Sequence, residues 1–440
     1  MLLDSPEVAS WPHWLTYTHD APDPGFKGVH IVASDFFGTL YGTVNSLPPL
    51  PLPVIENTPL LFGDPDILRF GDCLVVRADI VASSFFLLTR YEEWIRRDVR
   101  DHFGRFPGIE SLPYRAGFID RPIVDEYALL LRSWARQVGV ELPEPSRRFS
   151  VLLTHDVDEL FLRWRPVEMA RSIAKGIIGR QSWRSSLRQC LLAANPLRDP
   201  LNNIGEVIEM DRRLVDSFGA EMCGSVFFFM TGGKNQNGRR YRSYRITSGR
   251  VRRSMKLVQA AGAALGLHAS FEAGENADLV SSERASLERV AGAPIFRNRH
   301  HYLRWREIED GEAIASAGIT WDSSLGYSNV AGFRLGVCHP ITLFDPIRAR
   351  SLAIEEHPLI VMDVSLSSKI GMGLNEETAE RAVRKFAETT RRHQGEFVML
   401  WHNAALSSWG ADYHRRLYRN MLDWLAAVLD GDRRQCIGRS

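Results

Sequence analysis

Ionisable side chains directly follow several short apolar segments of the sequence. They are His155, Asp156 and Asp158 after FSVLLT, Arg299, His300 and His301 near residue 300, His268 after LGL, Asp322 after ITW, and His402 after FVMLW. In domains where helices connect parallel strands, the carboxyl ends of the strands meet on one side, and the groups that follow them come together. Aspartate and histidine are ligands that zinc and similar divalent ions accept. The pattern therefore indicates a metal site of the kind found in metallohydrolases.

Each of these positions also has a plainer interpretation. An Asp-x-Asp sequence after a strand is most often a turn or a helix cap, and a single histidine after an apolar run is usually hydrogen-bonded within the core. His300 and His301 could simply flank a strand. The metal interpretation is favoured only because the same residue types recur at successive strand ends.

The segments that must position these groups alternate between two patterns. Short apolar runs predict strands, and segments with apolar residues at helical spacing predict helices. The predicted strands are FSVLLTH, GSVFFFM, LGLHAS, PLIVMDVSL and EFVMLWH, and the predicted helices include SMKLVQAAGAA and NEETAERAVRKFAETTRR. This alternation predicts an α/β domain, with a parallel sheet or barrel covered by helices, over residues 149–440.

The first third of the chain differs from the rest. Residues 1–60 are rich in proline, CLVVRADIVA (73–82) predicts a strand, and SSFFLLTRYEEWIRR (83–97) predicts a helix capped by Ser83 or Ser84. A further helix is predicted for VDEYALLLRSWARQVG. ELPEPSRR (141–148) contains two prolines, so we place a boundary there and expect a separate N-terminal α/β domain at 1–148.

Composition narrows the class of protein. The 440 residues suggest two or three domains, and a formal charge of +1 argues against a generally basic surface for nucleic acid. Five cysteines without a CxxC pair argue against a disulfide framework or a cysteine-only zinc site and suit a reducing compartment. No signal-peptide pattern and no apolar run of about 20 residues is found, so we expect a cytoplasmic protein without a membrane span. The arginine-rich segment 180–250 is typical of a surface loop around GGKNQNGRRYRSYR.

Several of these motifs resemble one known family. LTHDVD (153–158) resembles the first motif of the polysaccharide deacetylases, the NodB-type carbohydrate esterases of family four. GLHAS (266–270) is similar to their histidine motif, WDSSL (321–325) to a strand-end Asp-Ser-Ser, and LWH (400–402) to their last motif. The motifs occur in the family's order, and the resemblance implies a distorted (β/α) barrel.

The resemblance also implies roles for individual residues. Asp156 corresponds to the catalytic base, Asp158 and His268 to ligands of Zn²⁺ or another divalent metal, and His402 to the general acid. Arg299 suits the family's residue that orients the base. We expect sugar contacts from the strand-end and aromatic side chains near these motifs, namely Asp322, Tyr327, Arg334 and Trp401.

One position departs from the family's pattern. The histidine motif normally carries a second histidine four residues after the first, where this chain has Glu272. Either Glu272 or His301 could supply the third metal ligand, since zinc accepts both carboxylate and imidazole. We favour His301, because its neighbour Arg299 fits the orienting role.

The longer string from RNRHHYLRW through LWHN resembles a bacterial subgroup in which a domain of unknown function precedes the deacetylase, with SSFFLLTRYEEW, HFGRF and RPIVDEYA as its features. Members tend to be encoded among surface-polysaccharide genes. The resemblance implies removal of an acyl group, expected to be N-acetyl, from a sugar or polysaccharide precursor in O-antigen or exopolysaccharide biosynthesis. The oligomeric state is left open.

Two alternatives compete with this hydrolase. An altered ligand set could leave a deacetylase-like protein that binds sugars or takes part in assembly without catalysis. VHIVASDFFGTL (29–40) also imitates the Asp-x-Asp-Gly-Thr motif of haloacid-dehalogenase-type phosphatases. Phe37 stands where that motif needs its second aspartate, so Asp35 is more simply a turn residue.

Overall fold

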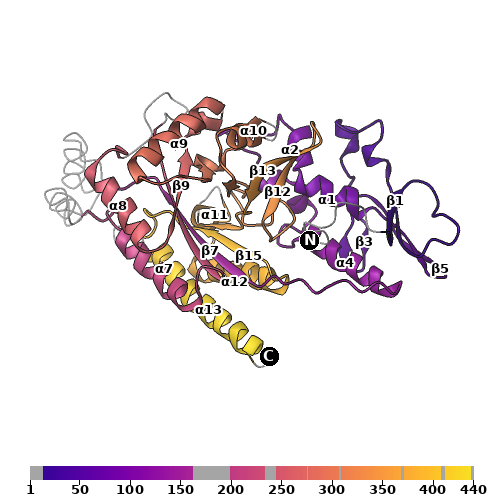
Figure 1. Cartoon of the computed structure of the whole chain (residues 1–440). Helices are drawn as coiled ribbons and strands as arrows, with labels where there is room; N and C mark the ends of the chain where they lie inside the picture. Colours follow the sequence, from indigo (N-terminus) through magenta and orange to yellow (C-terminus); the bar gives the residue numbers. More distant parts are fainter. Residues whose placement is uncertain are drawn as a thin grey trace.

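The structure is a computed structural model that describes residues 13–161, 199–232, 244–274, 276–306, 309–367, 371–407 and 412–437. Within these ranges the chain forms a four-stranded sheet from strands that end by Ala78 and a nine-stranded sheet from strands that begin at Ser150. In Figure 1 the smaller sheet lies at the right end of the molecule, and the larger sheet runs through its middle. Much of the arginine-rich segment 180–250, including most of its predicted loop, lies outside the described residues.

The smaller sheet belongs to the N-terminal part of the chain. Its order is β1-β2-β6-β5, with three parallel strands and an antiparallel edge. The strands are β1 (Leu15–Thr18), β2 (Gly28–Val32), β5 (Gly63–Phe70) and β6 (Cys73–Ala78). A two-stranded ribbon, the short helices and α4 (Ile123–Gln137) complete this part: β3 (Val54–Ile55), β4 (Thr58–Pro59), α1 (Ile80–Leu88), α2 (Tyr91–Ile95) and α3 (Leu112–Arg115).

The first helix begins earlier than the sequence predicted. Asp79, rather than Ser83 or Ser84, is the N-cap, and its Oδ1 accepts a hydrogen bond from Ala82 N at 2.8 Å. The predicted single helix is also two, because Arg90 adopts a left-handed conformation (φ 54°) between α1 and α2. Strand β6 ends at Ala78, and the next residue, Asp79, caps the helix. The helix therefore begins at Ile80, within the segment that was predicted as a strand.

The larger sheet carries eight parallel strands and one antiparallel edge strand, β12. Its order is β12-β13-β11-β10-β9-β8-β7-β15-β14. The strands are β7 (Ser150–Val157), β8 (Cys223–Phe229), β9 (Ala264–Ala269), β10 (Arg297–His300), β11 (Trp321–Asp322), β12 (Ile341–Asp345), β13 (Arg350–Glu356), β14 (Val361–Met362) and β15 (Glu396–Leu400). The parallel arrangement predicted from the alternating pattern is confirmed.

This sheet must curl, because one short stretch of chain reaches both of its ends. In the pairing order β13 and β14 are seven steps apart, which in a flat sheet would be roughly 34 Å at about 4.8 Å per strand. From Glu356 to Val361 the chain can span at most about 18 Å. Accordingly, His357 N bonds Asp322 O on one side (2.8 Å) and Ile360 N bonds Val398 O on the other (3.1 Å). PLIVMDVSL was predicted as one strand, but α11 (Asp363–Ser367) begins directly after Met362.

Helices pack on the outside of the curled sheet. They are α7 (Ile204–Phe218), α8 (Gly249–Ala260), α9 (Ala277–Ala291), α10 (Glu309–Ser316), α12 (Glu376–Arg392) and α13 (Asp412–Ile437). In Figure 1, α7, α8 and α13 line one outer side. Of the helices in the described ranges, none has both the length and the apolar character that a bilayer crossing requires.

Alternate residues of the strands build two apolar cores. Leu152, Phe228 and Leu400 belong to a small cluster, whereas their neighbours Leu153, Phe227 and Met399 belong to the large one. Successive side chains of a strand point to opposite faces, so the small cluster marks the concave inner face and the large one marks the face under the helices. The strands read as continuous apolar runs because both faces are buried.

Candidate metal centre

The inner face of the curled sheet becomes polar at the carboxyl ends of its strands. Along β7, Thr154 and Asp156 follow Leu152 at intervals of two, and Asp158 continues the series. The same period takes β15 from Leu400 to His402. Strand periodicity thus aims these groups at the interior of the curl, as the reading of strand ends predicted.

Three of the predicted ligands come together. The Oδ1 of Asp158 lies 3.2 Å from His268 Nε2 and 3.6 Å from His301 Nε2. One ligand atom of each residue lies within 4.8 Å of the others, and both imidazoles are buried, His268 completely. Two ligands at about 2.0–2.1 Å from a tetrahedral zinc lie roughly 3.3 Å apart. One carboxylate and two imidazoles at these separations therefore fit a divalent metal ion.

A backbone carbonyl orients the His268 ring. His268 Nδ1 lies 2.9 Å from Arg299 O, to which it can only donate. This bond leaves Nε2 as the ligand atom, and Nε2 faces Asp156 Oδ2 at 3.6 Å and Asp158 Oδ1 at 3.2 Å. Such a bond to the remote ring nitrogen is the usual way in which proteins aim a metal-binding histidine.

The electrostatics of the cluster follow from burial and opposite charge. Burial would raise the pKa of Asp158, but the His301 and His268 imidazoles outweigh it and hold this pKa well below its usual value. Burial lowers the pKa of His301, whereas for His268 the Asp156 and Asp158 carboxylates outweigh burial and raise the pKa. A cation that binds these ligands must displace any proton from the imidazole nitrogens it contacts, so protons and metal compete here.

The two candidates for the third ligand lie at different distances from the Asp158 and His268 pair. His301 lies in η6 (His301–Leu303), directly after β10, with its Nε2 beside Asp158. Glu272 lies in η5 (Phe271–Gly274) and is not part of the cluster.

Asp156 and Arg299 form a buried pair next to these ligands. Asp156 Oδ1 lies 3.4 Å from Arg299 Nη1, and Asp156 Oδ2 lies 3.6 Å from His268 Nε2. Arg299 is completely buried, and it also donates to Thr154 Oγ1 (2.6 Å) and to the carbonyl of Ser323 (2.7 Å). The guanidinium is therefore held rigidly where it can fix the Asp156 carboxylate.

His402 lies on the other side of Asp158 and has a partner that the sequence reasoning missed. His402 Nε2 is 3.8 Å from Asp158 Oδ2, and His402 Nδ1 is 2.8 Å from Oδ1 of the fully buried Asp363. Asp363 Oδ2 also accepts from His402 N at 2.9 Å. Burial lowers the pKa of His402, but Asp363 and the nearby Asp158 outweigh it and raise the pKa to about 10. The signal was present, since Asp363 follows an apolar run like the other site residues.

The four residues expected to contact sugar are buried within the protein. Asp322 accepts from Asn298 Nδ2 at 2.7 Å, and Arg334 donates to Glu93 Oε1 at 2.8 Å and lies over the ring of Tyr327. Tyr327 is 5% exposed and Trp401 not at all. Their partners in this structure are other residues of the chain.

Phe103 and Arg105 of the N-terminal part contact Tyr302, which lies beside the candidate centre. The ring of Phe103 stacks on that of Tyr302 at 4.5 Å, and Arg105 Nη1 donates to Tyr302 O at 3.1 Å. Tyr302 has a left-handed backbone (φ 63°), and its ring lies 4.2 Å from that of His301. Phe103 and Arg105 thus support the strained backbone of Tyr302, which adjoins the candidate metal ligand His301.

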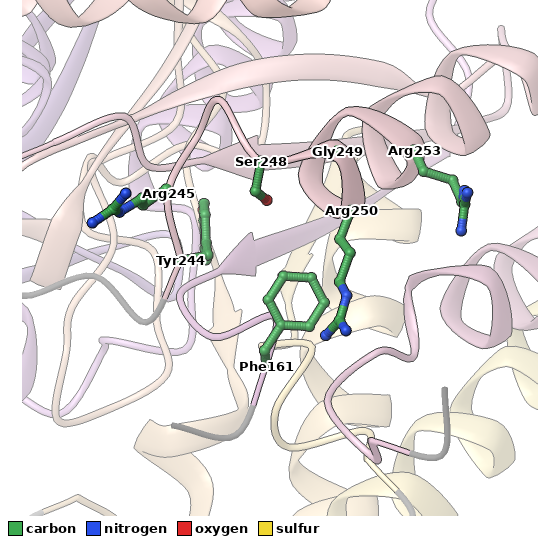
Figure 2. Close-up of a pocket in the computed structure, with 7 residues that line it drawn as sticks. All are labelled: Phe161, Tyr244, Arg245, Ser248, Gly249, Arg250 and Arg253. Carbon is green, nitrogen blue, oxygen red and sulfur yellow. The ribbon is translucent and has the colours of Figure 1, made fainter. Parts of the chain in front are cut away.

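A basic pocket of about 590 Å³ lies close to the carboxyl end of β7. Figure 2 shows the side chain of Arg250 beside Phe161, with Arg245 and Arg253 also in the lining. Phe161 follows Asp158 by three residues, and the hydroxyl of Tyr244, another lining residue, donates to Val157 O at 2.6 Å. The phosphatase-like aspartate lies elsewhere: Asp35 is exposed in η1 (Asp35–Phe37), where its carbonyl accepts from Gly38 N as in a turn.

Comparison with known proteins extends this description. Residues 12–139 match the profile of a family of unknown function, DUF7033. A crystal structure of a candidate polysaccharide deacetylase from Mycobacterium smegmatis is similar at 17% sequence identity and a TM-score of 0.39, over 66% of this chain and 87% of that one. No curated protein matches the chain. At this level of similarity the comparisons assign no activity.

Proposed function

We propose that the protein is a metal-dependent hydrolase that removes an acyl group, expected to be N-acetyl, from a sugar or polysaccharide precursor. The observation that carries the proposal is the convergence of Asp158, His268 and His301, with Asp156 on one side and His402 on the other. A metal ligand set flanked by a base and an acid is what amide hydrolysis needs.

Each residue has a part in the proposed reaction. When bound, a divalent ion such as zinc would polarise the acyl carbonyl and ease the deprotonation of water. Asp156 would accept a proton from the attacking water while the oxygen of that water bonds to the carbonyl carbon. His402 would donate a proton to the sugar nitrogen as the carbon–nitrogen bond breaks, which yields acetate and an amine.

The surrounding residues would hold these groups in place. Arg299 would fix the Asp156 carboxylate, and Asp363 would keep His402 oriented and protonated. Asp322, Tyr327, Arg334 and Trp401 would act as supports beneath the centre, because they are buried. We also propose a domain boundary after residue 148 and, from the cysteine pattern, a cytoplasmic location. The motif resemblance adds a role in surface-polysaccharide synthesis.

The metal ligands are tested by changing one residue at a time. We expect Asp158→Ala and His301→Ala to lose zinc from the candidate centre, measured by metal analysis of the purified protein, and to release no acetate from N-acetylated sugars. Glu272→Gln should retain the metal, and Asp216→Ala, a change at an exposed carboxylate on α7, controls for handling.

Contradictory results are easy to recognise. Full zinc content in Asp158→Ala would show that the proposed ligand set is wrong. Loss of zinc in Glu272→Gln, together with retention of zinc in His301→Ala, would show that Glu272 is the third ligand in place of His301. Zinc binding without acetate release from any N- or O-acetylated sugar would favour the sugar-binding alternative.

A further inference from the structure

A second group of metal-ligand types lies away from the candidate metal centre. Asp125 is in the first turn of α4, and Cys338 and His339 precede β12. One carboxylate oxygen, the sulfur and one imidazole nitrogen all lie within 4.8 Å of one another. The three residues are 4%, 1% and 8% exposed. Their convergence joins the N-terminal part of the chain to the larger sheet.

The separations are close to those that zinc imposes. Cys338 Sγ lies 3.3 Å from Asp125 Oδ2, and His339 Nε2 lies 3.8 Å from Asp125 Oδ1. Around a tetrahedral zinc, sulfur and oxygen ligands lie roughly 3.6 Å apart, and nitrogen and oxygen ligands roughly 3.3 Å. The two distances go to different oxygens of Asp125, so small side-chain rotations that bring one carboxylate oxygen, the sulfur and the imidazole nitrogen closer together would complete the geometry.

One atom of the cluster lacks the partner that its burial calls for. Asp125 Oδ1 makes no hydrogen bond with any described residue, although the side chain is almost fully buried. Asp125 and His339 both line a pocket of about 610 Å³, which gives an ion and a water molecule access to them.

Three segments of backbone hold the cluster in position. Val124 N donates to Gly336 O at 2.8 Å, and Glu396 N donates to Cys338 O at 2.7 Å. A side chain at Gly395 would place its Cβ 2.4 Å from Cys338 Sγ, so only glycine leaves room for the thiol there. The thiol thus has a fixed position beside a carboxylate and an imidazole.

We propose that Asp125, Cys338 and His339 form a second divalent-metal site, selective for zinc, that ties α4 to the larger sheet. Thiolate and imidazole ligands favour zinc over magnesium or calcium. Binding of the ion would displace the Cys338 proton, and the thiolate and carboxylate charges would then match the two charges of the ion. Arg147 and Glu144, which line the pocket, carry one positive and one negative charge. A water molecule from the pocket supplies the fourth ligand.

This site is separate from the candidate metal centre. Cys338 bonds to Glu396 at the beginning of β15, whereas His402 follows the end of that strand. The five residues of β15 put roughly 15 Å between the two ends. The centre at the carboxyl end also contains no cysteine, so a metal–sulfur signal reports on the second site alone.

Cobalt substitution tests the proposal on the full chain. Co²⁺ bound to a thiolate gives a near-ultraviolet charge-transfer band that carboxylate and imidazole ligands do not give. We expect this band in the wild type and in Asp158→Ala, and its loss in Cys338→Ser. Cys73→Ser, a change at another buried thiol, should retain it. In a zinc titration, Cys338→Ser should bind about one equivalent less than Cys73→Ser.

A second variant separates metal binding from folding. Asp125→Asn can still accept the hydrogen bond from Cys338 N, but it is a weaker ligand, and we expect it to bind Co²⁺ at this site at least tenfold more weakly while circular dichroism stays unchanged. The proposal is overturned if the wild type lacks the thiolate band, or if the band persists in Cys338→Ser. Neither result bears on acetate release.

Discussion

His402 depends on a buried carboxylate for its role as a proton donor. Asp363 holds the Nδ1 of His402 at 2.8 Å and contributes to the raised pKa of about 10, which keeps the imidazole protonated in neutral solution. We expect His402→Ala to lower kcat by about 10²–10⁴ while zinc remains bound, because only the acid is lost. Asp363→Asn should lower kcat less and shift the alkaline limit of activity to lower pH.

The measurements are kcat against pH and metal content for both variants. Asp345→Asn, a change at a buried carboxylate bonded to Arg348, serves as the control. An unaltered pH profile in Asp363→Asn would show that this carboxylate does not influence the protonation of His402. Normal turnover in His402→Ala would show that His402 is not the proton donor.

At the residue scale, the sequence predicted the positions that strand periodicity controls. Asp156, Asp158 and His402 follow apolar strands in register, so their meeting follows from the parallel sheet. His301 and Glu272 could not be separated by spacing, because their placement depends on the left-handed turn at Tyr302 and on η5. Asp363 was missed because the two-residue strand before it was interpreted as part of a longer one.

At the scale of elements, the stretch between β13 and β14 is held by one charged histidine. His357 Nε2 lies 2.9 Å from Glu355 Oε1, and Nδ1 lies 2.6 Å from Glu396 Oε2, while the ring stacks on Trp321. Burial lowers the pKa of His357, but Glu355 and Glu396 outweigh it and raise the pKa to about 9. The cation therefore connects the crossing stretch to β15.

A raised pKa makes this contribution depend on pH in a definite direction. The charge stabilises the fold fully below the unfolded pKa of about 6.5, and the stabilisation is lost as pH rises through about 9. The shift corresponds to about 3 kcal/mol, which we reduce to about 2 kcal/mol because Glu355 is largely exposed. Urea unfolding in chelator should show His357→Gln losing most stability near pH 6 and little at pH 9.5. His19→Gln, a change at an exposed histidine, serves as the control for handling.

The elements themselves were predictable where one pattern acts alone. Helix α12 and strands β7, β8, β9 and β15 follow the predicted segments closely, because each has an uninterrupted period. The crossing stretch was only partly predictable. Its apolar second half lies within the predicted strand PLIVMDVSL, but the pairing of the two halves with opposite ends of the sheet depends on the curl. Likewise, the cap at Asp79 depends on tertiary contacts to Ser34 and Tyr17.

At the scale of the whole molecule, a buried ion pair joins the two parts of the chain. Glu93 on α2 accepts from Arg334 Nε at 2.8 Å, and Arg334 also donates to Gly326 O at 2.8 Å. Both side chains are at most 5% exposed. Burial would raise the pKa of Glu93, but Arg334 outweighs it and keeps the carboxylate charged. Because the pair crosses between the parts, its loss should weaken their coupling as well as the fold.

Removing one partner leaves the other charge buried without compensation, which typically costs about 3–5 kcal/mol. We therefore expect Glu93→Gln to lower the free energy of unfolding by about 3 kcal/mol and to speed hydrogen exchange in β2, β6 and α4 more than in β7 and β8. Glu93→Gln combined with Arg334→Met should recover part of the loss, because no unpaired charge remains. Asp64→Asn, which removes an exposed pair with Arg77, should change stability by less than about 0.5 kcal/mol. Equal exchange changes in both parts, or none, would mean that the two parts are coupled by their apolar contacts and not by this pair.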